Sequence, residues 1–426
     1  MKAFRWLSLI LLLLGVQAVM TGAQSPALIV DASDIRGPIS PWVFGANYGL
    51  LNSIPFDLTD EAADLGITLW RFPGGRVGDT GDLQSFQIDM FMQQARQFGI
   101  TPLIHARLEN GTPEKAAALV RYVNIEKDYG VRFWSIGNEP DLWENYTTGQ
   151  KIRDWRLLAE AMLEVDPDII LIGPDVSQFV GDGRNAVAED YLREFLRENG
   201  DLVDIVAVHR YPFPRGSAKV LIDELRADAP TWDAIIANLR AVILEETGRD
   251  DLPVAVMEAS SNWSSQIWGE ATPDSHYNAI WWADVFGRLL RSQVEMIGYF
   301  NMQTSDRLGG HGLLAQYDVR PTYYTYILYK QFGDTLVHAE APDNDVTIYA
   351  ALNADGALTL MIVNMLDTAQ TRTLDLRGAT PAGDASVMLF DAERNAEPQP
   401  AQTVTSGTTL TLPPQSITLL TIPLAG

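Results

Sequence analysis

Two glutamates directly follow short apolar runs, where an ionised side chain is costly unless it has a partner or a task. One lies in Asn138-Glu139-Pro140, and the other is Glu258. Hydrolysis of a glycosidic bond needs two such carboxyl groups, one to protonate the leaving oxygen and one to attack the anomeric carbon. Glu139 and Glu258 are therefore candidates for these two roles. The alternative is that each glutamate only forms a structural ion pair with an arginine. This explanation would have to hold for both glutamates.

Apolar runs recur eight times before the last quarter of the chain, at 43–48, 67–72, 102–107, 131–137, 169–174, 205–211, 254–258 and 296–302. Several are continuous, as in parallel strands that are buried on both faces. Helical patterns lie between them, at 89–98, 113–123, 154–165, 188–196, 232–246 and 277–290. This alternation predicts an α/β fold, a (β/α)8 barrel over residues 38–333. An open doubly wound sheet is the alternative, but no Gly-x-Gly-x-x-Gly turn follows any run.

The pattern changes after Gly333. Short alternating segments appear, separated by turn residues, at 346–352, 358–363, 372–376, 386–390, 408–412 and 416–422. They predict an appended all-β sandwich over residues 334–426. The segment 27–32, within 24–37, alternates in the same way, and we expect it to add a strand to that sandwich.

The residues at the strand ends are the candidates for chemistry, because the active site of such a barrel lies at the C-terminal ends of its strands. Arg71, His209 and Tyr211 end the second and sixth runs. Trp143 and Trp263 lie in the loops after the two glutamates, where a flat ring could stack on a sugar. We expect these five side chains to contact the substrate or to position the carboxylates.

Some neighbouring residues have simpler interpretations. Trp281 and Trp282 fall within a helical pattern and are predicted to be core. Asp141 and Glu144 flank the first glutamate in its loop and are predicted to be solvated.

The motifs resemble clan A of the retaining (β/α)8-barrel glycoside hydrolases. The resemblance rests on Glu258 and on three stretches, Asn138-Glu139-Pro140, Trp70-Arg71-Phe72-Pro73-Gly74-Gly75 and His209-Arg210-Tyr211. The last two stretches and the predicted sandwich are similar to the β-xylosidase and α-L-arabinofuranosidase-like branches. The resemblance implies that Glu139 is the acid/base, that Glu258 is the nucleophile, and that Asn138 binds a sugar hydroxyl.

The resemblance also implies a carbohydrate substrate and a contact between Tyr211 and the nucleophile. The eighth run ends in Phe300-Asn301, where many members of the clan carry a tryptophan. Trp143, Trp263 and Trp268 are candidates to replace that ring. A catalytically inactive carbohydrate-binding barrel is the alternative function.

The composition argues against cofactor chemistry. There are no cysteines, and none of the five histidines forms a His-x-His or His-x-x-x-His pair. Neither a Gly-x-Ser-x-Gly elbow nor a phosphate-binding loop is present. We therefore expect no metal and no cofactor in the site.

The N-terminus has the three parts of a secretory signal peptide. A basic segment at 1–5 precedes an apolar run at 6–20 and the small residues Thr21-Gly22-Ala23. A membrane anchor is the alternative, but a span needs ~20 apolar residues and this run is shorter. We expect cleavage after Ala23, removing residues 1–23, and a secreted or periplasmic protein. The net charge of −24 argues against nucleic acid or an anionic membrane as a partner.

Overall fold

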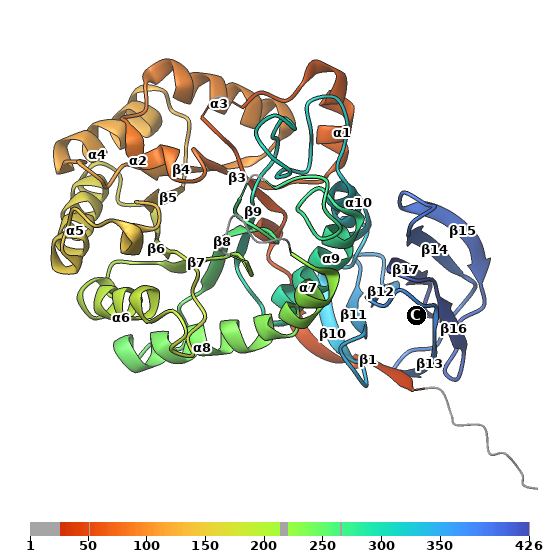
Figure 1. Cartoon of the computed structure of the whole chain (residues 1–426). Helices are drawn as coiled ribbons and strands as arrows, with labels where there is room; N and C mark the ends of the chain where they lie inside the picture. Colours follow the sequence, from red (N-terminus) through yellow and green to blue (C-terminus); the bar gives the residue numbers. More distant parts are fainter. Residues whose placement is uncertain (1–25, 51, 214–219, 265, 426) are drawn as a thin grey trace, which may run out of the picture.

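The computed structural model describes residues 26–50, 52–213, 220–264 and 266–425. It consists of a closed eight-stranded barrel and a nine-stranded sheet that lies beside it (Figure 1). No helix in these ranges is both long enough and apolar enough to cross a membrane. The predicted signal peptide lies outside the described residues.

The barrel strands follow one another around the ring in chain order, and each pairs in parallel with its neighbours. They are β2 (Gly45–Asn47), β3 (Leu69–Phe72), β4 (Thr101–Ala106), β5 (Phe133–Ile136), β6 (Ile170–Val176), β7 (Ile205–Arg210), β8 (Val254–Ala259) and β9 (Met296–Tyr299). Each overlaps one of the eight apolar runs. The predicted (β/α)8 fold class is therefore confirmed.

Helices cover the outside of the barrel. They are α1 (Thr59–Asp64), α2 (Val77–Thr80), α3 (Ser85–Phe98), α4 (Pro113–Val120), α5 (Thr148–Val165), α6 (Ala186–Asn199), α7 (Ile222–Asp228), α8 (Thr231–Thr247), α9 (His276–Arg291) and α10 (Pro321–Tyr329). Local signals set their ends: Thr112 caps α4 and is followed by Pro113, and Thr147 and Gln150 form a capping box on α5.

Large apolar side chains fill both faces of the barrel sheet. Inside the ring, residues such as Leu103, Phe133 and Met257 form one buried cluster. Outside it, the helices bury a larger cluster that includes Trp281 and Trp282, both fully buried on α9. These two tryptophans are core residues, as predicted. Burial on both faces explains why the strands read as continuous apolar runs.

The second unit is a single sheet in the order β15-β14-β17-β12-β11-β10-β1-β13-β16. Its strands are β1 (Ala27–Pro38), β10 (Thr335–Glu340), β11 (Val346–Leu352), β12 (Leu358–Asn364), β13 (Gln370–Arg377), β14 (Ala385–Phe390), β15 (Glu397–Gln402), β16 (Thr409–Leu412) and β17 (Ser416–Ile422). All its pairs are antiparallel except β1 with β13. β14 and β16, which lie near opposite ends of the order, share one apolar cluster, so the sheet curls around it as a sandwich does.

Two of these strands were not predicted from the sequence. β15 contains Pro398 and Pro400, and its side chains are mostly exposed at the edge of the sheet. Prolines are rare in strands, so this sequence pattern does not predict one. An edge strand tolerates proline because one of its sides has no neighbouring strand to pair with. β10 begins two residues after Gly333 and lies between β1 and β11.

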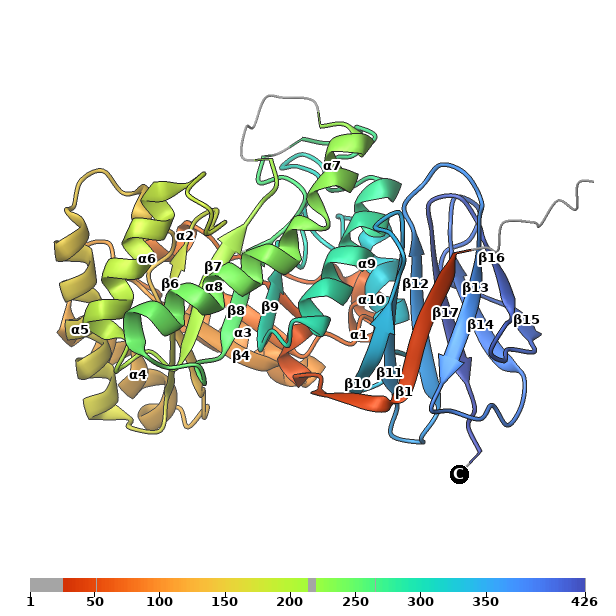
Figure 2. The ribbon, with the colours of Figure 1, turned by 90° about the horizontal axis from the view of Figure 1, so that it is seen from below.

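The curled sheet packs on the side of the barrel formed by α9 and α10 (Figure 2). Polar contacts cross the boundary: Asp284 on α9 accepts hydrogen bonds from Thr347 Oγ1 and Tyr349 Oη, both at 2.6 Å. His276 also stacks on Phe390, with their ring centroids 4.9 Å apart. The sheet thus covers the outer wall of the barrel and stabilises α9.

Candidate active site

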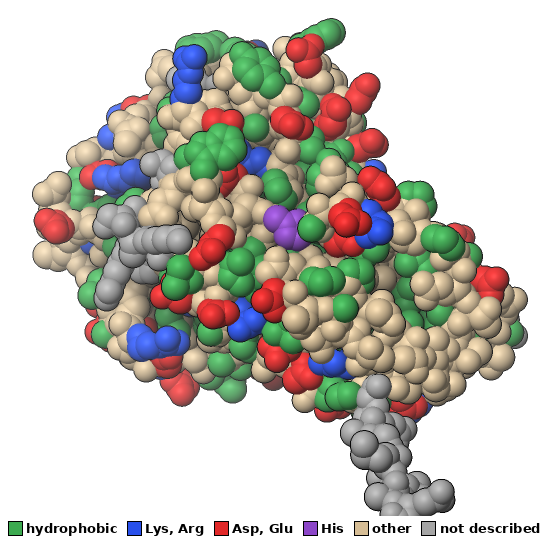
Figure 3. Space-filling view, turned by 45° about the vertical axis from the view of Figure 1, so that its right-hand side comes forward, with side chains coloured by type: hydrophobic (Ala, Val, Ile, Leu, Met, Phe, Trp, Pro, Cys, Tyr) green, Lys and Arg blue, Asp and Glu red, His purple; other side chains and the backbone are tan. Residues whose placement is uncertain are grey.

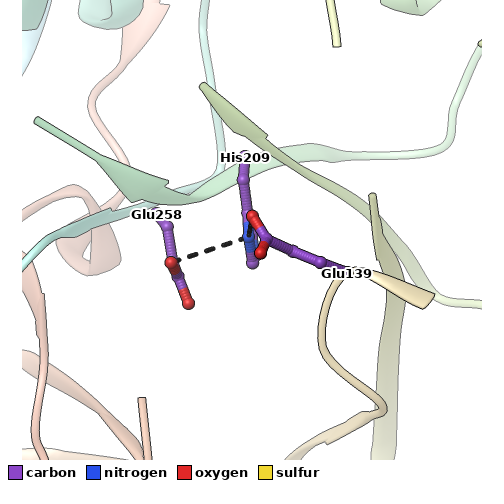
Figure 4. A group of neighbouring side chains, drawn as sticks. All are labelled: Glu139, His209 and Glu258. Atoms are coloured by element: carbon purple, nitrogen blue, oxygen red, sulfur yellow. Dashed lines mark hydrogen bonds and ion pairs between the residues drawn. The ribbon is translucent and has the colours of Figure 1, made fainter. Parts of the chain in front are cut away.

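The candidate residues come together at the C-terminal ends of the barrel strands. Figure 4 shows Glu139, His209 and Glu258, which come from the ends of β5, β7 and β8, facing one another. Ligand atoms of all three side chains lie within 4.8 Å of one another. One carboxylate oxygen of Glu139 is therefore no more than 4.8 Å from one of Glu258.

Glu258 receives one donor on each carboxylate oxygen. Arg71 Nη1 donates to Oε1 at 2.8 Å, and Tyr211 Oη donates to Oε2 at 2.8 Å. Burial and then the charge of Glu258 raise the pKa of Tyr211 well above its usual value, so its hydroxyl keeps its proton. The buried ion pair and this hydrogen bond together fix the position of the carboxylate.

Glu139 is held differently. Its backbone is left-handed, with φ 48° and ψ 51°, a conformation that costs a non-glycine residue about 1 kcal/mol or more. Its N–H donates to the carbonyl oxygen of Asp175 at 2.9 Å. The side chain is 20% exposed, and its Oε1 lies 3.2 Å from Nδ1 of His209. This backbone turn directs the carboxyl group toward Glu258 while leaving it open to solvent.

Arg71 is fully buried and connects several strand ends. Besides Glu258, its guanidinium donates to Oδ1 of Asn47 and Oδ1 of Asn138, and to Oδ2 of Asp175, each at 3.0 Å. Burial opposes the charge of Arg71, but Asp175 and Glu258 outweigh it and raise the pKa of Arg71 above its usual value. A cation with two buried carboxylate partners fixes the positions of both.

Sequence reasoning missed Asp175 and Asn47. Asp175 is fully buried and follows the fifth apolar run, as the two glutamates follow theirs. That position was the signal that could have identified it. Asn47 is the last residue of β2, and its Nδ2 donates to carbonyl oxygens of β8 and β9, at 2.8 Å from Met257 and 3.1 Å from Gly298.

His209 lies between carboxylates and is fully buried. Its Nδ1 faces Glu139 and, at 3.7 Å, Oε2 of Glu258; its Nε2 lies 3.5 Å from Oδ1 of Asp175. Burial opposes protonation, but the charge of Glu258, together with the nearby carboxylates of Asp175 and Glu139, raises the pKa of His209 to about 10. The imidazole thus carries a proton at neutral pH, next to Glu139.

The same three side chains could be considered as a metal site, since each offers a ligand atom. A metal would have to displace the proton of His209, whose pKa the surrounding carboxylates raise. Arg71 and Tyr211 already occupy the oxygens of Glu258. The arrangement is better suited to moving protons and placing charge than to binding a cation.

Asp79, which was also missed, positions Asn138. Asp79 Oδ2 accepts from the backbone N–H of Asn138 at 2.7 Å, and Oδ1 accepts from Leu108 at 2.7 Å and Glu109 at 3.1 Å. The Asn138 side chain accepts from Arg71, while its buried Nδ2 has no hydrogen-bond partner among the described residues. That amide is therefore a donor that a bound hydroxyl could use.

The predicted aromatic contacts differ in their surroundings. Trp143 is buried, and the guanidinium carbon of Arg76 lies 5.4 Å from its ring centroid, so one face of the indole is covered. Trp263 is half-exposed. Phe300, where the clan often has a tryptophan, packs edge-to-face against Tyr211 with centroids 6.2 Å apart. Phe300 therefore brings an aromatic ring next to the residue that contacts Glu258.

The predicted solvation of Asp141 is wrong. Its carboxylate accepts hydrogen bonds from the backbone N–H and the hydroxyl of Ser177, at 2.9 and 2.5 Å, and burial raises its pKa. The first turn after Glu139 folds back onto the end of β6, which a linear reading of the loop does not show. Glu144 is exposed, as predicted.

The raised pKa of His209 predicts a pH-dependent stability. Folded His209 keeps its proton up to about pH 10, whereas the unfolded side chain loses it near 6.5. This stabilisation is complete below 6.5 and is lost as pH rises toward 10, with a slope of at most ~1.4 kcal/mol per pH unit. Urea unfolding across this range measures it. Asp175→Asn removes one carboxylate partner and should flatten the decline; identical slopes in both proteins would contradict the assignment.

Charged side chains of both signs are mixed on the surface of the protein. On the face shown in Figure 3, Lys and Arg side chains lie among Asp and Glu and do not gather into a patch. This face offers no concentrated positive charge to a polyanion.

Solved structures that share this fold include glycoside hydrolases, whereas no protein-family model and no curated protein matches the sequence. A family 51 α-L-arabinofuranosidase from Bifidobacterium longum is 17% identical with a TM-score of 0.76, over 94% of this chain and 100% of that one. The bifunctional glucanase-xylanase CelM2 from a metagenome library is 19% identical with a TM-score of 0.74, over 94% and 100%. A family 44 xyloglucanase from Paenibacillus polymyxa is 17% identical with a TM-score of 0.73, again over 94% and 100%. At these identities the likeness establishes the fold, a barrel with a sheet-rich second unit.

Proposed function

We propose that this protein is a retaining glycoside hydrolase in which Glu258 is the nucleophile and Glu139 the acid/base. The observation that carries the proposal is the facing pair of carboxylates, with oxygens within 4.8 Å of each other. Retaining enzymes separate these groups by ~5–5.5 Å, whereas inverting enzymes need ~6.5–9.5 Å to admit a water molecule. The short separation therefore favours direct attack by Glu258 on the sugar.

The different surroundings of the two glutamates support their roles. Glu258 is buried against Arg71 and Tyr211, which favours the anion that a nucleophile must be. Glu139 is more open, and its nearest titratable partner is the protonated His209. The acid/base must both release and recover a proton, and its access to solvent suits that role.

The reaction takes two steps. In the first, Glu139 gives its proton to the glycosidic oxygen while an oxygen of Glu258 bonds to the anomeric carbon, which releases the alcohol and leaves a glycosyl ester. In the second, Glu139 takes a proton from water, whose oxygen displaces Glu258 from the anomeric carbon. Two inversions return the original configuration. The buried amide of Asn138 is the donor we assign to a sugar hydroxyl beside the reacting carbon.

The substrate we propose is a plant- or microbe-derived polysaccharide or oligosaccharide. Similar structures are described as an α-L-arabinofuranosidase, a glucanase-xylanase and a xyloglucanase, which support this substrate class. Turnover should be tested on nitrophenyl β-xyloside, α-L-arabinofuranoside, β-glucoside and β-glucuronide, and on the matching polysaccharides. Proton NMR of the product released first should show the retained anomer. An inverted first product would refute the mechanism. Glycan binding without any turnover would indicate an inactive carbohydrate-binding barrel.

We further propose that the mature protein acts outside the cytoplasmic membrane, after cleavage behind Ala23. The basic segment, apolar run and small residues at 1–23 support this. N-terminal sequencing of material recovered outside the cytoplasm should start at Gln24. A sequence that starts at Met1 would contradict the proposal.

A further inference from the structure

A depression of about 510 Å³ lies at the end of the barrel where β2 and β9 close the ring. One wall belongs to the loop after β2, which contains the short helix η2 (Phe56–Leu58). The other belongs to the loop between β9 and α10. Asn52 Nδ2 donates to the carbonyl oxygen of Gln303 at 2.7 Å and joins the two loops. Both loops follow the C-terminal ends of their strands, so the depression lies at the same end of the barrel as the candidate site (Figure 1).

Two strongly exposed rings line this depression. Phe56 is 92% exposed and Tyr317 is 78% exposed, and they come from different loops. Gln316 Nε2 donates to the Tyr317 hydroxyl at 2.7 Å. Four side chains that can hydrogen-bond to hydroxyl groups also line the depression: Asp57, Gln303, Arg307 and Gln316. Flat apolar rings flanked by amide and charged groups match the C–H faces and hydroxyls of a sugar.

The depression lies near the candidate active site, along the segment that follows β9. Gln303 lies three residues after Phe300, and three residues span at most roughly 11 Å. A Cβ placed on Gly75 would lie 3.3 Å from the Phe300 ring and 3.9 Å from Oε1 of Glu258, so Phe300 and the nucleophile flank the same glycine. A chain held in the depression therefore needs to extend only a short distance to reach Glu258.

The next loop around the barrel adds further aromatic surface. Trp263 and Trp268, in the loop between β8 and α9, are half and largely exposed. This loop contacts the β9–α10 loop, because the carbonyl oxygen of Trp263 lies 3.0 Å from Nε2 of His311. Exposed aromatic side chains thus come from the loops of three neighbouring strands, β8, β9 and β2. Such a band suits an extended ligand better than a single sugar.

We propose that the depression lined by Phe56 and Tyr317 is a distal subsite for a neutral glycan chain, whose cleaved bond lies at Glu258. The proposal rests on the glycosidase function proposed above and extends it, because it makes the substrate an oligosaccharide or polysaccharide. One arginine and one aspartate line the depression, and the protein has a net charge of −24. These charges favour a neutral chain over an acidic one.

Binding to the Glu258→Gln protein, measured by calorimetry, tests the proposal without turnover. The probes are disaccharides and hexasaccharides of the cello, xylo and arabino series, with an oligogalacturonate hexamer as the acidic probe. For at least one neutral series, the hexamer should bind about tenfold more tightly than the dimer. Adding Phe56→Ala and Tyr317→Ala should remove that gain, about 1.4 kcal/mol. Phe86→Ala, which removes a ring 60% exposed outside the depression, should not.

In protein that retains Glu258, the two substitutions Phe56→Ala and Tyr317→Ala together should leave the turnover of nitrophenyl monosaccharides at the wild-type rate. Three results would overturn the subsite but leave the glycosidase activity standing. The first is a tighter binding of the hexamer that survives both substitutions. The others are equal binding of dimer and hexamer, and a preference for the acidic hexamer. Absence of both glycan binding and nitrophenyl glycoside turnover would instead overturn the proposed function, and the subsite with it.

Discussion

Replacing Glu258 with glutamine is expected to lower kcat by about 10,000-fold or more on every glycoside that the enzyme hydrolyses. Glutamine keeps the shape of the side chain, but its amide is a poor nucleophile and cannot form the glycosyl ester. The loss should not depend on the leaving group, because the bond from Glu258 to the anomeric carbon forms in the first step. Steady-state kinetics with activated and unactivated aryl glycosides measure this.

Glu144→Gln is the matched control, because Glu144 is an exposed glutamate in the loop that follows Glu139. It should retain wild-type kinetics. The stability of the Glu258→Gln protein has to be measured as well. In this protein Arg71 loses one of its two buried carboxylate partners and retains Asp175, which can lower the free energy of unfolding. Wild-type activity in a folded Glu258→Gln protein would refute the assignment of the nucleophile.

The fold class could be predicted because the barrel strands have a simple sequence pattern. β6 and β7 are buried on both faces and read as unbroken apolar runs, and helical patterns separate them from their neighbours. The prediction of the curled sheet was less complete, because β15 lies at an exposed edge and contains two prolines. Strand patterns depend on burial, so an edge strand carries the weakest signal.

The candidate site was partly accessible from the sequence for a related reason. Glu139, His209 and Glu258 end apolar runs, and a barrel brings the ends of its strands together. The structure places them in contact distance, although their catalytic roles stay predictions. Asp175 had the same kind of signal, whereas Asp79 lies on α2 and follows no apolar run. The importance of both aspartates lies in the groups that they bind. Asp175 holds Arg71, and Asp79 holds the backbone of Asn138, contacts that only the folded chain defines.

The charge of His209 could not be predicted from the sequence either. It depends on three carboxylates, contributed by β6, β8 and the turn after β5, that lie within about 4 Å of one imidazole. None of them is a sequence neighbour of His209. The surroundings of Glu139, a carboxyl group beside a charged imidazole and open to solvent, are therefore defined only by the folded chain.

Glu139→Ala is the second substitution with a large expected effect. Glycosides with poor leaving groups should lose about 100- to 10,000-fold in kcat/KM, because their oxygen must be protonated as it departs. Dinitrophenyl glycosides need no proton, so they should still form the glycosyl ester with Glu258. The ester should then accumulate, because water lacks its base, and kcat and KM should fall together. Comparing the two substrate types by steady-state kinetics gives the first test.

Azide gives the second test, because it is a nucleophile that needs no base. In Glu139→Ala, azide should enter from the side that the acid/base occupied, displace Glu258, and yield a glycosyl azide of retained configuration with restored kcat. In Glu258→Ala, azide should instead occupy the place of the nucleophile and yield the inverted azide. Proton NMR distinguishes the two products. An inverted azide from Glu139→Ala would exchange the roles of the two glutamates, since each product reports the face of the sugar from which a carboxylate is missing.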